Sequence, residues 1–191
     1  MSRGAPARRV RPVHIADNVA EVPRLADGTI YMRSTESIEP YPVRLTDRLE
    51  YWAAEAPDRV FLAQRPAPAP GQAPEDVSGW RTVTYRQALE QVRRLAQGLI
   101  DRKLSRDRTV VILSSNSIEH ALLALAAMYV GVPYPPIAPA YSLQATEFGT
   151  LRQVFDRMKP GLVFAAEGAK FERALKDTLP PGAELVVASS E

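Results

Sequence analysis

The sequence predicts an α/β protein with a doubly wound, mainly parallel sheet flanked by helices, and a small antiparallel hairpin near the N-terminus. Apolar runs at residues 110–113, 162–165 and 185–188 are typical of strands buried on both faces. Segments with helical spacing of apolar residues separate these runs, as in repeated βαβ units. With 191 residues, 46% of them hydrophobic, the chain is long enough to bury the core of one domain.

Composition excludes several kinds of protein. The chain has no cysteine, so it forms no disulfide, thiolate metal site or cysteine nucleophile. The net charge is only +2 and most arginines are spread among acids along the sequence, which argues against nucleic-acid binding. No apolar run reaches the roughly 18–20 residues of a membrane span. We therefore expect no membrane contact, a buried helix at residues 121–132, and a cytoplasmic location.

The N-terminal residues differ from the rest. Residues 1–13 contain four arginines, no acid and no apolar core of a secretory signal. We expect a disordered basic arm at residues 1–18, followed by one α/β domain at residues 19–191. Two apolar stretches within residues 19–33 flank Asp27 and Gly28, a turn pair typical of a hairpin.

Local signals then predict each element in turn. Thr46 is expected to cap a helix that ends before Pro57. Strands follow at residues 59–65 and 80–83, separated by a Pro- and Gly-rich loop at residues 66–79. Thr84 and Gln87 form a capping box that opens a helix reaching Leu99.

The second half alternates regularly after the strand at residues 110–113. We expect a helix capped by Asn116, with Glu119 completing a capping box, and closed by Gly131. The remaining elements come in sequence order: a strand at 133–137, a helix near 144–158, a strand at 162–165, a helix at 169–179 and a strand at 185–188. Because the sequence stops directly after an apolar strand, we expect further sequence in the native protein or self-association.

Standard catalytic motifs are missing. The sequence contains no Gly-Lys-Ser/Thr phosphate loop, Gly-x-Gly-x-x-Gly turn, Gly-x-Ser-x-Gly elbow or His-Glu-x-x-His pair. Its two histidines, His14 and His120, are too few for a metal site. We expect His14 in the solvated arm and His120 as a packed or capping residue.

Two segments contain candidate substrate-binding residues. Ser115 and Asn116 lie between a strand and a helix, where open α/β sheets bind ligands. The competing interpretation of these two residues is a helix cap with polar turn residues. Tyr141, with Tyr134 and the prolines between them, forms either the wall of a groove for a flat aromatic acid or a packing contact.

Several longer runs resemble one enzyme superfamily. Residues 84–89 and 121–133 resemble structural segments of the adenylate-forming acyl-CoA synthetases and luciferases. Residues 116–125, 139–143 and 160–164 resemble the feruloyl-CoA synthase family most closely. Members of that family often carry a serine at the position of Ala138 and a lysine near Thr150, so the match is incomplete.

The resemblance implies a two-step ligase reaction in a longer enzyme. A carboxylate such as ferulate attacks the α-phosphate of ATP, with Mg²⁺ offsetting the phosphate charge, and coenzyme A then displaces AMP. The family's phosphate loop and mobile C-terminal lysine match nothing up to Glu191, so we expect no catalytic, cofactor-binding or metal-binding residue in this chain. We expect it to be an N-terminal subdomain that is inactive alone and packs against the remaining C-terminal parts.

Two alternatives stay open at this point. The enzyme could activate another carboxylic acid, such as a fatty or benzoic acid, because the resemblance implies that substrate selection depends largely on later segments. The chain could instead be a non-catalytic binding or scaffold domain of the same fold.

Overall fold

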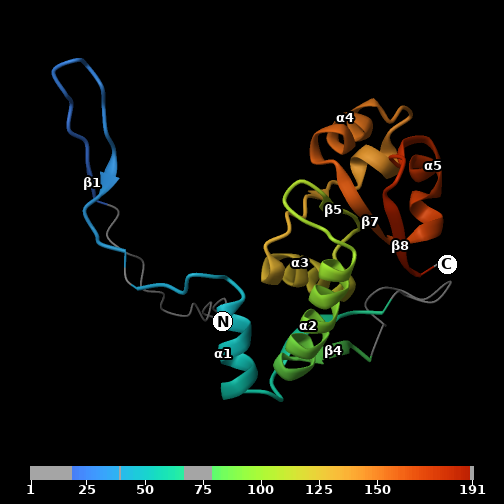
Figure 1. Ribbon diagram of the computed structural model, residues 1–191. Coiled ribbons are helices and arrows are strands. Elements are labelled where there is room, and N and C mark those ends of the chain that lie inside the picture. The colour runs from blue at the N-terminus through green and yellow to red at the C-terminus, as the bar shows by residue number, and fades with distance from the viewer. Residues whose placement is uncertain (1–18, 39, 67–78, 190–191) are drawn as a thin grey trace, which may run out of the picture. The chain divides into compact units, whose positions relative to one another are not determined.

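The computed structural model describes residues 19–38, 40–66 and 79–189 (Figure 1). These residues fall into two compact units, one ending at Tyr41 and the other beginning at Pro42. The predicted basic arm and nearly all of the predicted loop at residues 66–79 lie outside the described residues. In the part of the chain that is described, no helix is both long and apolar enough to cross a membrane.

The N-terminal unit contains the predicted hairpin. Strands β1 (Ala20–Glu21) and β2 (Arg33–Ser34) pair in antiparallel fashion. The turn between them uses the expected dipeptide: Gly28 has a φ of 88° and Asp27 Oδ1 accepts the Thr29 amide proton at 2.9 Å. Glycine suits this turn because it adopts positive φ without steric cost.

The second unit begins with helix α1 (Asp47–Glu55), followed by strands β3 (Val60–Gln64) and β4 (Arg81–Thr84). The two strands form their own antiparallel sheet. Helix α1 starts where predicted, but the expected Thr46 cap is wrong, because its hydroxyl makes no capping bond. Thr46 adopts a helical conformation, and its buried hydroxyl oxygen has no hydrogen-bond partner among the described residues.

Helix α2 (Tyr85–Asp101) confirms the predicted capping box. The Gln87 amide donates to Thr84 Oγ1 at 3.3 Å, and the Thr84 amide donates to Gln87 Oε1 at 3.0 Å. One side of the helix is buried against the sheet and the next helix through Ala88, Val92, Ala96 and Leu99.

The main sheet has four parallel strands in the order β6-β5-β7-β8. Its strands are β5 (Thr109–Leu113), β6 (Pro136–Ile137), β7 (Pro160–Glu167) and β8 (Glu184–Ser189). The helices between them are α3 (Ile118–Val130), α4 (Gly149–Met158) and α5 (Gly168–Thr178).

Two predicted elements are shorter than expected. The strand expected at residues 133–137 covers only Pro136–Ile137, because the prolines before it have no amide proton to donate to a ladder. The helix expected from residue 144 begins only at Gly149. A π-helical turn, η2 (Ala140–Gln144), precedes it, and the extended backbone of Ala145 separates the two.

Helices cover both faces of the main sheet, which confirms the predicted doubly wound α/β class. Alternate side chains of β5 divide between two cores. Val110 and Ile112 pack with α2 and α3, whereas Val111 and Leu113 pack with α4 and α5. Figure 1 shows these two pairs of helices on opposite sides of the sheet. Because all four strands are parallel, their carboxyl ends lie at the same edge of the sheet. The turns that follow these ends are where open parallel sheets usually bind ligands.

Candidate functional site

A polar cleft of about 260 Å³ lies at the carboxyl edge of the main sheet. The turn after β5 lines it, as do the ends of β7 and β8 through Ala166, Glu167 and Ala188. Gln64 and Arg81, from the β3–β4 sheet, also line it. The cleft thus lies where strand ends of an open parallel sheet converge.

The turn after β5 comprises residues 114–117. Ser114 is buried and its hydroxyl donates to the Ser115 carbonyl at 2.6 Å. Ser117 is extended and its Oγ accepts the His120 amide proton at 3.0 Å, so Ser117 is the cap of α3. The prediction that Asn116 caps this helix is wrong by one residue, because only the extended backbone of Ser117 directs its oxygen at that amide.

Moving the cap to Ser117 changes the interpretation of Ser115 and Asn116. Both line the cleft and are exposed. Neither side chain makes a hydrogen bond with another described residue, whereas a capping Asn116 would have been occupied. Their hydroxyl and amide groups are therefore available as neutral donors and acceptors.

The β3–β4 sheet holds the start of α3 in place. Gln64 Oε1 accepts the Ile118 amide proton at 2.9 Å, which satisfies a donor at the first turn of the helix. Arg81 pairs with Glu119 at 2.5 Å and lies 3.5 Å from Gln64 Oε1. Sequence reasoning missed both residues and assigned Glu119 to a capping box. The only available signal was that both lie in predicted strands.

Charge in the cleft does not favour phosphate groups. The Arg81 guanidinium is engaged by Glu119, and Glu167 adds a second carboxylate, which pairs with Lys170. The cleft therefore offers no unpaired cation among its described lining residues. No cluster of acidic or histidine side chains suited to a metal ion occurs within residues 19–38, 40–66 and 79–189.

Tyr141 lies apart from Ser115 and Asn116. It is on η2, which follows β6 at the same edge of the sheet but on the other side of β5, and it is 45% exposed. Tyr141 does not line the cleft. Tyr134 is half-buried and packs against the core beneath α2 and α3.

Of the two histidines, only His120 lies within the described residues. His120 is half-buried at the first turn of α3, with Nδ1 3.3 Å from the Ser115 carbonyl, which matches the predicted packed or capping role. His14 lies outside the described residues.

Comparison with known proteins places the fold in a family context. The model of the family described as "AMP-binding enzyme" matches residues 49–189, which is most of the chain. One of the subunits of the mycosubtilin synthase of Bacillus subtilis is 31% identical over 107 residues, a match that covers 54% of this chain and 4% of that protein.

Solved structures show the same fold at lower identity. The fatty acyl-adenylate ligase of L. pneumophila, solved with acyl adenylate and pyrophosphate, is 15% identical with a TM-score of 0.57. The match covers 77% of this chain and 23% of that one. VinN is 18% identical with a TM-score of 0.58, covering 78% of this chain and 32% of VinN. The chain therefore spans about a quarter to a third of these structures.

Proposed function

This chain belongs to the AMP-binding enzyme family, and we propose that it is the N-terminal part of an ATP-dependent ligase. That ligase joins a carboxylic acid to coenzyme A. In such a reaction the carboxylate attacks the α-phosphate of ATP and releases diphosphate. The thiol of coenzyme A then attacks the acyl carbon and releases AMP. The observation that carries this proposal is the polar cleft at the carboxyl edge of a sheet with this family's fold.

The cleft is proposed to bind the acid or its acyl-adenylate rather than the triphosphate of ATP. Its lining cation, Arg81, is already paired with Glu119, so a triphosphate would gain no charge neutralisation there. Ser115 and Asn116 supply neutral hydrogen-bonding groups instead. ATP, Mg²⁺ and coenzyme A are assigned to parts of the enzyme outside this chain.

Ferulate, or a related hydroxycinnamate, is the acid that we propose. The support is the resemblance of residues 116–125, 139–143 and 160–164 to feruloyl-CoA synthases. Tyr141 adds no support from the cleft itself, because its exposed ring lies on the other side of β5 and does not line the cleft.

The test is thioester formation that depends on ferulate, ATP and coenzyme A. It compares the 191-residue chain with the longer protein that contains it, using benzoate and a fatty acid as competing substrates. We expect turnover of ferulate by the longer protein and none by the chain alone, because no phosphate-binding loop lies within it. A preference for another acid would overturn ferulate alone. Turnover by the short chain would overturn the assignment of ATP to other segments.

A further inference from the structure

A glutamine and an arginine of the β3–β4 sheet reach the start of α3 together. Gln64 and Arg81 are opposite each other in the two strands, so their side chains leave the sheet on the same face. Gln64 Oε1 accepts the Ile118 amide proton at 2.9 Å, and Arg81 pairs with Glu119 at 2.5 Å. Two successive residues of α3 are therefore held by two facing residues of a separate sheet.

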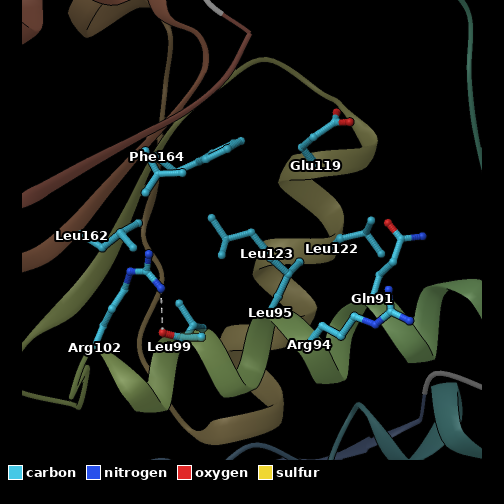
Figure 2. A pocket seen from close by; sticks show the side chains of 12 residues that line it. Gln91, Arg94, Leu95, Leu99, Arg102, Glu119, Leu122, Leu123, Leu162 and Phe164 are labelled. Atoms are coloured by element: carbon cyan, nitrogen blue, oxygen red, sulfur yellow. Dashed lines mark hydrogen bonds between the residues drawn. The ribbon is translucent and has the colours of Figure 1, made fainter.

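The two contacts differ in how firmly they hold the helix. Figure 2 shows Glu119 at the first turn of α3, with its carboxylate directed away from Leu122 and Leu123 of the same helix. The side chains of Arg81 and Glu119 are 53% and 34% exposed, and an ion pair this accessible to water contributes little. The hydrogen bond from the part-buried Ile118 amide is therefore the stronger restraint.

The turn before α3 is restrained on both sides of Asn116. On one side the Ser115 carbonyl lies 3.3 Å from Nδ1 of His120 in the first turn of α3. On the other side Gln64 holds the Ile118 amide. The Asn116 side chain is exposed in the cleft between these two fixed points. Its orientation therefore depends on where the start of α3 is held.

Side-chain packing alone does not fix the distance between β3 and this turn. A pocket of about 150 Å³ lies there, lined by Leu62, Ala63, Gln64, Asn116, Ser117 and Ile118. The pocket leaves the turn room to shift, and the Gln64 side chain spans the space with its hydrogen bond. Ile118 is 5% exposed and packs in the core, so the helix itself stays anchored when this bond is removed.

We propose that Gln64 is a positioning residue for the acid. By fixing the start of α3, it holds Asn116 in the orientation that binds the acid. This inference rests on the proposed function, in which the cleft binds the acid. A binding group that is ordered beforehand costs less free energy to immobilise when the ligand arrives. The Gln64 bond therefore contributes to the affinity for the acid, although Gln64 acts only through Asn116.

Amide hydrogen exchange of the 191-residue chain is the first measurement. Gln64→Leu keeps much of the side chain but removes the acceptor, so exchange at Ile118 should become about three- to tenfold faster. Gln64→Glu keeps an acceptor and should exchange as slowly as the unmodified chain. Gln97→Leu is the matched control, because Gln97 bonds to Asp101 at 2.8 Å on the exposed side of α2. Unchanged exchange at Ile118 in Gln64→Leu would overturn the proposal.

Kinetics of the longer protein test the consequence for the acid. Gln64→Leu should raise the KM for the acid about threefold and leave kcat unchanged, because the contact to Asn116 is made equally in the bound acid and in the transition state. A smaller fraction of folded protein would instead lower kcat and leave the KM unchanged. In an Asn116→Ala background, Gln64→Leu should add nothing to the KM, since it acts through Asn116.

The Asn116→Ala variant separates this inference from the proposed function. If Asn116→Ala raises the KM for the acid and Gln64→Leu does not, the positioning role is wrong and the proposed use of the cleft stands. Additive effects of the two substitutions would also overturn the positioning role. If Asn116→Ala leaves the KM unchanged, the proposed acid site is wrong and the inference fails with it.

Discussion

At the scale of single residues, Glu50 joins three helices. Its carboxylate on α1 accepts the Tyr129 hydroxyl of α3 and pairs with Arg93 of α2 at 3.3 Å. Arg44 lies 3.8 Å away, just before α1. The hydrogen bond from Tyr129, followed by the bond and charge of Arg93 and the charge of Arg44, lowers the pKa of Glu50.

Tyr129→Phe should therefore raise the pKa of Glu50 towards its ordinary value. A carboxyl whose pKa is lower in the folded than in the unfolded state stabilises the fold above the unfolded value, and this stabilisation disappears as pH falls through the folded value. In the variant, less stability should be lost on acidification. An NMR titration measures the pKa of Glu50. Denaturant unfolding from neutral to acidic pH measures how much stability is lost on acidification. Tyr51→Phe, on an exposed ring of α1, is the control. An unchanged titration would contradict the assigned cause.

Thr46 is a buried residue whose hydroxyl bonds to no other described residue. It is 1% exposed and its Oγ1 has no partner among the described residues. Thr46→Val keeps the shape and removes the unpaired oxygen, so the free energy of unfolding should rise by about 1 kcal/mol. Thr46→Ser keeps the oxygen, loses the methyl group and should lower stability. Urea unfolding of the two variants decides the matter, and a less stable valine variant would show that the hydroxyl has a partner.

At the scale of elements, the start of β7 depends on a glycine. A Cβ at Gly161 would lie 2.3 Å from Arg108 Cγ and 2.7 Å from Leu104 Cδ2. Gly161→Ala should cost about 1–3 kcal/mol of stability by overpacking. Adding Arg108→Ala should recover part of the loss. Gly149→Ala is the matched control, because nothing lies within 4 Å of its Cβ position at the start of α4. Strict additivity of the first two substitutions in thermal unfolding would contradict the clash.

Elements whose signals are local could be predicted from the sequence. The capping box of α2 needs only two residues three apart, and both of its hydrogen bonds form. The start of α3 shows the limit of such reasoning. Asn116 and Ser117 are both suitable cap residues, and the choice depends on backbone conformation, which composition does not reveal. The short β6 reflects prolines whose effect on the ladder depends on the pairing partner.

At the scale of the whole molecule, the cleft was only half predictable. The turn after β5 was found from topology, since strand ends of a parallel sheet share an edge. Gln64 and Arg81 reach the same place from a separate two-stranded sheet, and no spacing in the sequence links them to Ile118 and Glu119. Tyr141 shares the edge but follows a strand on the other side of β5, so the three candidate residues do not form one cluster.

The cleft also leads to a prediction for the longer enzyme. If the cleft binds the acid through Asn116, Asn116→Ala should raise the KM for ferulate about three- to tenfold, because one hydrogen bond to the acid is lost. The KM for ATP should stay unchanged, because the cleft offers no unpaired cation to phosphate among its described residues. Gln153→Ala, on the exposed side of α4, is the control. A rise in the KM for ATP instead would show that the nucleotide binds at this edge of the sheet. Arg81 would then have to leave Glu119 and pair with a phosphate group.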